Sequence, residues 1–320
     1  MLFRAENICK TYYKKGFFRF DNNNNLDALR DINISVQEKD IIGILGETGS
    51  GKSTLGRIFV GLEKPTKGLL LYNNKNIFDL NKKEFREFQR STSFIFQDPY
   101  SSFNPKMKVL DILLEPLILG GIERAKRKDI IDEVVEDMGL KNDDLQKFPY
   151  QFSGGQRQRI AIARSLILKP KFLVADEPVS SLDLSIKAQI LKLFEKIYEK
   201  NNLTMMIISH DLSIIEYLCN KSVVIYKGLI MEEAFTEKLF SNPLHPYTKL
   251  LIESAPTLYS TRAEDIKTEV FEPSLDFNKT KLRLCPFLER CKLKFDKCKE
   301  NLPEITEVET NHKVRCHRYG

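Results

Sequence analysis

The chain has 320 residues, enough for one large domain and an appendage, and its 42% hydrophobic and 29% charged residues are ordinary for a globular protein. The longest apolar stretch, Val109–Ile122, is interrupted by Asp111 and Glu115 and is too short for a membrane-spanning helix, and the first ten residues lack the apolar core of a signal peptide. The net charge of +6 comes from scattered lysines and one run, Arg124–Lys128, that begins an amphipathic helix. Composition therefore gives no indication of a nucleic-acid partner.

Two adjacent aromatic residues, Tyr12 and Tyr13, follow the first apolar segment. Upstream of the phosphate-binding loop described next, an aromatic ring can stack on the adenine of a nucleotide. Core packing is the commoner role of such a residue, so this motif is weak by itself. We predict that Tyr12 stacks on adenine, with Tyr13 as the competing candidate.

A strand, a glycine-rich loop and a helix form the strongest motif of the chain. The apolar run Asp40–Leu45 predicts a buried strand. The glycines after it let the backbone turn tightly and point its N–H groups at phosphate, where the helix expected from Lys52 adds the positive end of its dipole. Lys52 is predicted to reach the β- and γ-phosphates, and Ser53 to ligate Mg²⁺. We expect ATP contacts from the whole loop, which consists of Gly46, Glu47, Thr48, Gly49, Ser50, Gly51, Lys52, Ser53 and Thr54.

An amide ends the next predicted strand, in the segment Ser93–Pro99. The side-chain carbonyl of Gln97 can contact Mg²⁺ or the water that attacks phosphate. A strand-end glutamine without a role is the alternative. Because the strand lies between the P-loop and the next motif, we predict that Gln97 is a catalytic residue and a Mg²⁺ ligand.

Two carboxylates end the buried strand predicted for Phe172–Glu177, where both would be costly unless they were used. Asp176 can hold Mg²⁺ through water, and Glu177 is placed to polarise the attacking water as general base. The segment Ser181–Asp183 follows at once, and Asp183 is expected at a subunit seam.

A histidine, His210, follows the apolar strand predicted for Met205–Ile208. A lone histidine after a strand is usually structural. Here it can contact the γ-phosphate and hold Glu177 in line, so we predict that it is catalytic.

The string Phe-Ser-Gly-Gly-Gln, from Phe152 to Gln156, together with the P-loop upstream, resembles the ABC transporter ATPases. The motifs cover roughly the first two thirds of the chain, from Tyr12 to His210. The resemblance implies an α/β P-loop NTPase fold of the ABC type and a dimer that sandwiches two ATP molecules. It also implies that one set of residues approaches the γ-phosphate of ATP held by the partner; this set is Ser153, Gly154, Gly155 and Gln156.

The segment Asn242–Thr248 looks like the tag of the oligopeptide and dipeptide importer ATPases. Segments Phe96–Pro105 and Asp176–Asp183 agree with that family, except that Phe103 stands where it more often has Leu. Such importers have two non-identical ATPases. The run Gln156–Arg159 and the insertion Gly16–Asn25 look like the second of them, often lettered F.

Four cysteines, Cys285, Cys291, Cys298 and Cys316, crowd into the C-terminal tail with gaps of five, six and seventeen residues. A cytosolic location argues against disulfides, and four thiolates suit Zn²⁺ or an iron–sulfur cluster. Since no Cys-x-x-Cys hairpin is present, we predict a [4Fe–4S] cluster, which the resemblance also implies because some members of this importer family carry such cysteines. Zinc, unligated thiols and occasional disulfides remain open, with His317 as a possible substitute ligand. We expect this site to lie far from the P-loop.

The motifs predict three parts. Residues 1–240 form the ABC ATPase domain, and within it residues 98–165 form a helical subdomain that carries the signature. Residues 241–320, called the tail below, form a cysteine-bearing C-terminal extension with little apolar periodicity. A metal staple would compensate for its thin core.

The resemblance also implies a function and partners. The chain is expected to hydrolyse ATP at the cytoplasmic face of the membrane, in a heterodimer with a second ATPase, and to drive two permease subunits that take peptides from an extracellular binding protein. Alternatives are the same machine with another cargo, such as nickel, glutathione or an oligosaccharide, and a soluble ABC ATPase without a transporter. Soluble members of the repair type separate the P-loop from the signature by long coiled coils, and those of the translation type usually carry two ATPase domains in one chain. This chain has neither feature, which argues against the soluble alternative.

Overall fold

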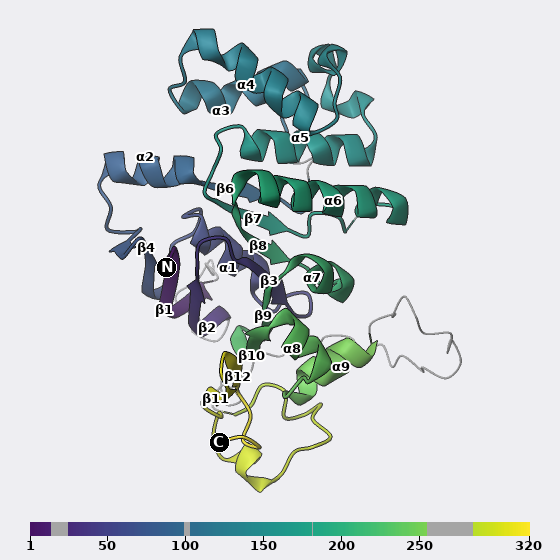
Figure 1. Cartoon of the computed structure of the whole chain (residues 1–320). Helices are drawn as coiled ribbons and strands as arrows, with labels where there is room; N and C mark the ends of the chain where they lie inside the picture. Colours follow the sequence, from purple (N-terminus) through teal and green to yellow (C-terminus); the bar gives the residue numbers. More distant parts are fainter. Residues whose placement is uncertain (14–24, 99–102, 181, 255–283) are drawn as a thin grey trace, which may run out of the picture.

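The computed structural model describes residues 1–13, 25–98, 103–180, 182–254 and 284–320. Figure 1 shows a helical layer at one end, sheets in the middle and the yellow tail at the other end. The predicted insertion Gly16–Asn25, apart from Asn25, lies outside the described residues, as do Tyr100 and Ser181.

The larger sheet of the described chain has the strand order β11-β12-β10-β9-β3-β8-β7-β6. Its central strands β9, β3, β8, β7 and β6 run parallel, and the remaining strands pair antiparallel. The strand bounds are β3 (Ile41–Leu45), β6 (Thr92–Ile95), β7 (Phe172–Asp176), β8 (Thr204–Ile208), β9 (Lys221–Tyr226), β10 (Leu229–Phe235), β11 (Thr306–Glu309) and β12 (His312–Val314).

The central strands are apolar throughout because both faces of the sheet are covered. Ile42 and Ile44 of β3 pack into one core cluster, whereas Ile41 and Leu45 pack into the other. This alternation is what a parallel strand buried on both faces requires. The predicted strands at Asp40–Leu45, Phe172–Glu177 and Met205–Ile208 are therefore confirmed within a residue at each end.

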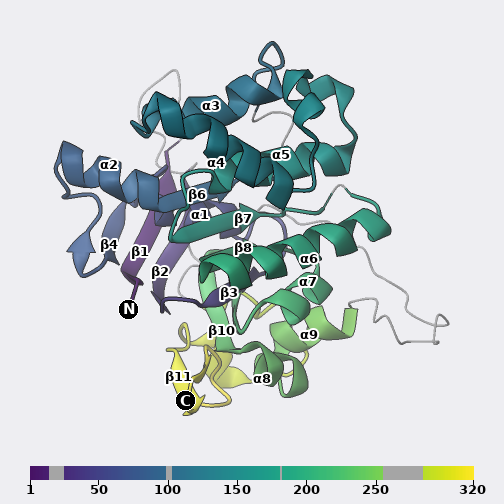
Figure 2. The same cartoon turned by 45° about the horizontal axis from the view of Figure 1, so that its top comes forward.

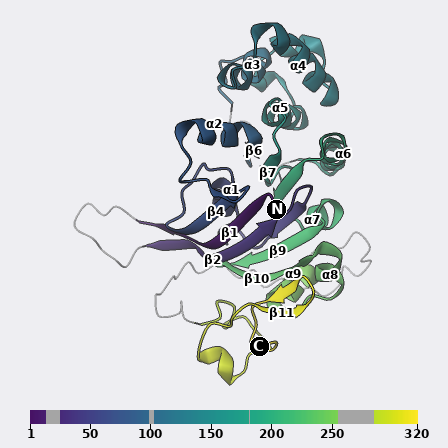
Figure 3. The ribbon, with the colours of Figure 1, turned by 60° about the vertical axis from the view of Figure 1, so that its left-hand side comes forward.

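A second, antiparallel sheet has the order β2-β1-β4-β5 and covers one of these clusters. Figure 3 shows β1 and β2 lying beside β9 and β10. The strands are β1 (Phe3–Tyr12), β2 (Leu26–Val36), β4 (Lys67–Tyr72) and β5 (Lys75–Asn76). This sheet is the antiparallel N-terminal part of the ATPase domain.

Helices surround the larger sheet and form the layer that Figure 2 turns toward the viewer, with α3, α4 and α5 grouped together. Short 3-10 turns link α4 to α5, at Asn142–Gln146 and Pro149–Gln151. The helices are α1 (Lys52–Phe59), α2 (Lys82–Ser91), α3 (Val109–Leu119), α4 (Arg124–Asp137), α5 (Gly154–Leu166), α6 (Leu184–Asn201), α7 (Leu212–Leu218), α8 (Thr236–Ser241) and α9 (Pro246–Ser254). Thus α3 to α5 fall within the segment 98–165 predicted to be helical, or within a residue of it.

The tail contributes strands to the main sheet, which the sequence analysis does not predict. Strand β12 pairs with β10, and Glu232 of β10 lies opposite Val314. The carboxylate of Glu232 is fully buried, where it accepts from the backbone N–H groups of Leu244 and His245 at 2.8 and 2.9 Å and bonds His312 Nε2 at 2.8 Å. Because these contacts are hydrogen bonds to a buried carboxylate, they leave no apolar periodicity in the sequence, and β11 and β12 could not be predicted from it.

Candidate active site

The P-loop joins β3 to α1 and has the backbone that its glycines permit. Gly46, Gly49 and Gly51 all have positive φ, at 148°, 80° and 105°. A Cβ on Gly51 would lie 2.3 Å from the carbonyl oxygen of Ala28, so no other residue fits there. Helix α1 begins at Lys52 directly after the loop, as predicted, and points its N-terminus into the concave turn.

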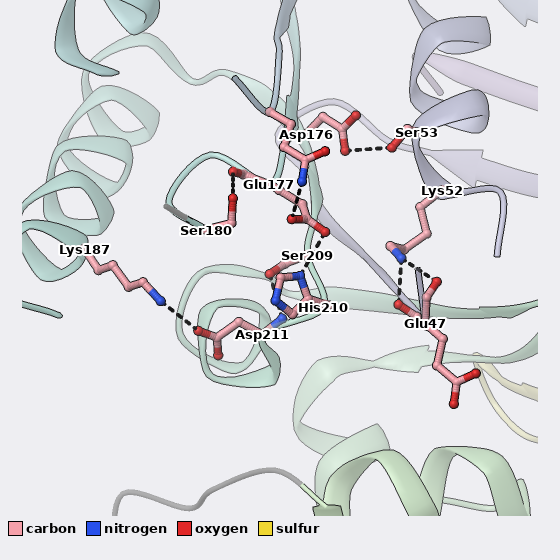
Figure 4. Close-up of polar contacts among 12 residues, drawn as sticks. Glu47, Lys52, Ser53, Asp176, Glu177, Ser180, Lys187, Ser209, His210 and Asp211 are labelled. Carbon is pink, nitrogen blue, oxygen red and sulfur yellow. Dashed lines mark hydrogen bonds and ion pairs between the residues drawn. The ribbon is translucent and has the colours of Figure 1, made fainter. Parts of the chain in front are cut away.

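Lys52 is 5% exposed, and its ammonium donates to the carbonyl oxygens of Gly46 and Glu47 at 2.6 and 2.8 Å (Figure 4). Burial lowers the pKa of Lys52, while the carboxylates of Glu177, Asp176 and Glu47 oppose that shift. A buried ammonium beside backbone N–H groups makes this concavity suited to phosphate.

Ser53 and Asp176 meet although 123 residues separate them, with Ser53 Oγ donating to Asp176 Oδ1 at 3.0 Å. Asp176 ends β7 and is 3% exposed, and burial raises the pKa of its carboxyl group. A hydroxyl and a buried carboxylate are oxygen ligands of the kind that Mg²⁺ takes beside nucleotide phosphates, so the donor set fits that ion.

Glu177 is the centre of a polar cluster shown in Figure 4. Its two carboxylate oxygens bond His210 Nδ1 and Gln97 Nε2, each at 2.9 Å. Its backbone has φ of 47°, a left-handed conformation that is uncommon for a residue with a side chain. The structure therefore brings together the three predicted catalytic residues.

Gln97 lies in a different setting from the predicted one. Strand β6 ends at Ile95, so Gln97 is in the exposed segment that follows it rather than at the strand end. The side-chain amide nitrogen of Gln97 donates to Glu177 Oε2 at 2.9 Å, and the side-chain carbonyl oxygen of Gln97 takes no part in that bond.

Of the two candidate tyrosines, only Tyr12 contacts the P-loop helix among the described residues. Its hydroxyl lies 3.3 Å from Thr54 Oγ1, and Lys10 Nζ lies 5.1 Å from the ring centroid. Tyr13 is 66% exposed. Strand β1 ends at Tyr12, so Tyr13 lies just beyond the strand.

The predicted signature residues form the N-terminus of α5. Ser153 is the N-cap, with its hydroxyl accepting from the backbone N–H of Gln156 at 3.3 Å and the Gln156 side chain accepting from Ser153 N–H at 3.0 Å. This capping box leaves the N-terminal N–H groups of Gly154 and Gly155 without intrahelical partners. Asp183, predicted at the subunit seam, is exposed at the N-terminus of α6.

Cys285, Cys291, Cys298 and Cys316 line one pocket, called the cysteine pocket below, together with Phe287, His245 and His317. All four are free thiols, and burial raises the pKa of Cys285 to about 11. Among the described residues, no three His, Cys, Asp or Glu side chains come together closely enough to hold a metal ion. The predicted ligand set is thus gathered around one pocket but not drawn to bonding distance of one ion.

The tail touches the P-loop, and one of the contacts is made by Arg290, the neighbour of Cys291. This corrects the expectation that the cysteine site lies far from the P-loop. Tyr247 Oη accepts from the backbone N–H of Glu47 at 2.9 Å, and Arg290 Nη1 donates to the Glu47 carboxylate at 2.8 and 3.0 Å. Sequence reasoning missed Arg290. Its position beside Cys291 was the only available signal, and it says nothing about a contact 243 residues away.

Family models match two parts of the chain. The ABC transporter model matches residues 29–180, and the model described as the oligopeptide/dipeptide transporter C-terminal region matches residues 231–298. Within the described part of the chain, no helix is both long and apolar enough to cross a membrane.

Curated relatives extend over nearly the whole chain. The dipeptide transport ATP-binding protein DppF of Haemophilus influenzae is 40% identical over 96% of this chain and 94% of its own. The putative oligopeptide transport ATP-binding protein YkfD of Bacillus subtilis is 38% identical, over 91% and 89%.

Solved structures share the fold. The dimeric ATP-binding cassette MJ0796, in a post-hydrolysis state with ADP and Pi, is 28% identical, covers 73% of this chain and 99% of its own, and has a TM-score of 0.64. The cbiO1 protein of Clostridium perfringens, part of the ABC transporter complex cbiONQ, is 26% identical over 75% and 91%, also with a TM-score of 0.64.

Proposed function

The chain belongs to the ABC transporter family of ATPases, in the group that carries the oligopeptide/dipeptide transporter C-terminal region, and we propose that it hydrolyses ATP to power the import of peptides. The observation that carries this proposal is the assembled site around Glu177, with Lys52, Ser53 and Asp176 beside it. Relatives named for dipeptide and oligopeptide transport support the cargo.

In the proposed reaction, Lys52 and the P-loop N–H groups bind the β- and γ-phosphates, and Tyr12 stacks on adenine. Ser53 and Asp176, with Gln97 nearby, would hold Mg²⁺, which supplies neutralisation of phosphate charge. Glu177 accepts a proton from the attacking water, and it is kept in place by Gln97 and His210. The carboxylate is held before reaction, so little reorganisation is needed as charge develops.

The partner of this site is a second, homologous ATPase. The exposed Ser153 N-cap and its glycines form a helix N-terminus suited to a phosphate that another subunit holds. Asp183, at the start of α6, would lie at the seam between the two subunits. The dimeric ATP-binding cassette with the same fold supports this arrangement. The pair would act at the cytoplasmic face, where ATP is available, with two permease subunits and an extracellular peptide-binding protein.

A groove between the sheet edge and the helical layer is the proposed docking surface for the permease. Phe94 and Phe96, Leu168 and Pro116 line it, and Phe96 is 41% exposed. The groove adjoins Gln97, so a subunit seated there could sense the catalytic cluster. Tyr100 and Phe103 are the aromatic residues that follow Gln97 in the chain. Tyr100 lies outside the described residues, and Phe103 is 6% exposed within the core, so a charge there would disturb folding itself.

The test of the transport function is co-purification with membrane proteins. The tagged chain, extracted from its own cells in mild detergent, should bring down two permeases and a second ATPase. Phe96→Glu should lose the permeases and still bind MgATP, because Phe96 is outside the P-loop. Recovery of the chain without any membrane protein would contradict the proposal.

We further propose that the cysteine pocket holds a [4Fe–4S] cluster. Four thiols that line one pocket support this proposal, and a cluster of four irons holds its ligands wider apart than one ion does. The spacing is too wide for the zinc alternative as the side chains stand. When bound, the cluster would staple together the chain segments that carry the four cysteines.

Chemical analysis separates the two metals. Protein purified without oxygen should be brown and contain about four irons and four acid-labile sulfides per chain. Cys298→Ser should bleach it. Stoichiometric zinc without iron would contradict the cluster and favour the single-ion site.

A further inference from the structure

Glu47 of the P-loop is held from three directions. Its carbonyl oxygen accepts from Lys52 Nζ at 2.8 Å, its backbone N–H donates to Tyr247 Oη at 2.9 Å, and its carboxylate accepts from Arg290 Nη1 at 2.8 and 3.0 Å. Figure 4 shows the Lys52 ammonium bonded to the Glu47 backbone carbonyl, with the Glu47 carboxylate pointing away from Lys52. One residue therefore joins the phosphate-binding lysine to two residues of the tail.

The contact with Tyr247 is a rigid anchor. Tyr247 is fully buried, and its ring lies 4.5 Å from Tyr226 and 5.4 Å from Phe287, centroid to centroid. Burial raises the pKa of its hydroxyl, which stays neutral and available as an acceptor. The backbone of Glu47 is thus fixed to the sheet through a packed aromatic cluster.

The contact with Arg290 is the adjustable one. The guanidinium packs over the rings of Tyr226 and Phe287, at 5.8 and 5.5 Å, and its side chain is 29% exposed. Stacking orients the planar group so that one nitrogen meets both oxygens of Glu47. An alkyl ammonium could not be oriented in this way.

Arg290 is also part of the wall of the cysteine pocket through its chain neighbour. The backbone N–H groups of Arg290 and Cys291 both donate to the carbonyl oxygen of Phe287, at 3.1 and 2.9 Å. Phe287 and Cys291 line the pocket. A single turn thus carries a thiol that faces the pocket and a guanidinium that faces the P-loop, so a shift of one moves the other.

We propose that Arg290 is a positioning residue that couples the cysteine pocket to the P-loop: it holds Glu47, and through the Glu47 carbonyl it holds Lys52, so that a change at Cys291 alters the affinity for nucleotide. This inference rests on the proposed ATP-binding function and adds a site that controls it. The coupling acts through the orientation of Lys52, because its ammonium must point at the phosphates in order to bind them.

The expected effect is moderate, because the Arg290–Glu47 pair is partly open to solvent, with side chains 29% and 41% exposed. Loss of a geometrically good, partly exposed pair weakens binding by about 2–5-fold. The same argument predicts an effect on ATP affinity and on KM, and little effect on kcat, because Glu177 and its partners do not contact Arg290.

The experiment measures the Kd for MgATP by titration calorimetry on the full-length chain, for wild type, Arg290→Ala, Arg290→Lys and Glu47→Gln. Arg290→Ala and Glu47→Gln should each raise the Kd about 2–5-fold, and the double variant should be no worse than either. Arg290→Lys should restore part of the affinity. Lys292→Ala, on the exposed far side of Cys291, is the matched control and should bind as wild type does.

Cys291→Ser tests the coupling itself. It should raise the Kd for MgATP in the wild-type background and change it less than about twofold in the Arg290→Ala background. Unaltered affinity in Glu47→Gln, which leaves the tail untouched, would overturn the positioning role. Unaltered affinity in Cys291→Ser would overturn the coupling.

The outcomes also separate this inference from the proposed function. Wild-type protein that fails to bind MgATP contradicts the function itself. Wild-type binding that is lost in Lys52→Ala and unchanged in Arg290→Ala and Glu47→Gln keeps the function and rejects the inference alone.

Discussion

Glu177 stands at the meeting point of three segments distant in sequence. Its φ of 47° and its bonds to Gln97 and His210 show that several contacts determine where this one carboxylate lies. Left-handed backbone costs roughly 1 kcal/mol or more for a residue with a Cβ, and it persists only where the surroundings enforce it. Such a conformation at a carboxylate beside the P-loop fits a positioned general base.

Glu177→Gln is expected to keep MgATP affinity and to lower turnover by about 10²–10⁴-fold, since the amide cannot accept the proton of the attacking water. The measurement is phosphate release at saturating MgATP in the assembled complex. Glu216→Gln, the same change on the exposed face of α7, is the control and should leave the rate unchanged. A near-normal rate in Glu177→Gln would show that Glu177 is not the general base.

Much of this site could be predicted from the sequence because its residues stand next to one another in the chain or at the end of a clear apolar strand. The glycines of the P-loop, Lys52 and Ser53 are consecutive, and Asp176 and Glu177 end a strand whose apolar run is plain. Arg290 and the buried acceptor Glu232 could not be predicted in the same way. Each acts through contacts across the fold, and neither carries a local signal for its partner.

At the scale of elements, α5 packs closely against α6 because Gly155 has no side chain. A Cβ on Gly155 would lie 2.6 Å from Ile186 Cγ2 of α6, whereas a Cβ on Gly154 would meet its nearest neighbour, Leu182 Cδ2, at an ordinary 3.4 Å. Gly155 therefore serves helix packing as well as the exposed N-terminus.

Gly155→Ala is expected to lower the free energy of unfolding by about 1–3 kcal/mol, because α5 must move away from α6. Gly154→Ala is the matched control and should be neutral or slightly stabilising, since alanine favours helix. Urea unfolding of both variants checks this pair. Equal stability of the two would show that the close approach to Ile186 does not matter.

Glu232 of β10 links the tail to the main sheet through its hydrogen bonds to Leu244, His245 and His312. Removing one partner of a buried, hydrogen-bonded charge is costly, so Glu232→Ala should reduce the free energy of unfolding by about 3–5 kcal/mol. Glu237→Ala, exposed in α8, serves as control. Limited proteolysis should cut the tail faster in Glu232→Ala. A loss below about 1 kcal/mol would mean that Leu244, His245 and His312 find other partners.

The fold shows the same division between local and distant information. Strands β3, β7 and β8, buried on both faces, could be read from continuous apolar runs. The hairpin of β11 and β12 could not, because both strands are short, β11 is mostly exposed, and β12 joins the sheet by pairing with β10 and by the bond of His312 to the carboxylate of Glu232.

At the scale of the whole molecule, the helical layer with α5 forms one end and the C-terminal part of the tail forms the other (Figure 1). The P-loop, at the end of β3, contacts the tail through Tyr247 and Arg290. Such a body offers its signature helix N-terminus outward, for another subunit. It also places the proposed permease groove next to Gln97 and the tail next to Glu47. A subunit bound in the groove would therefore lie next to Gln97, and a change in the tail would reach the phosphate-binding loop through Glu47.

We propose that this chain hydrolyses ATP at its full rate only within a membrane complex. The most direct measurement is the rate of MgATP hydrolysis by the purified chain alone, and then with the second ATPase and both permeases in vesicles. We expect slow hydrolysis by the isolated chain, a rise on assembly, and a further rise with peptide-loaded binding protein. Full activity of the isolated chain as a monomer, unchanged by any membrane subunit, would contradict the account.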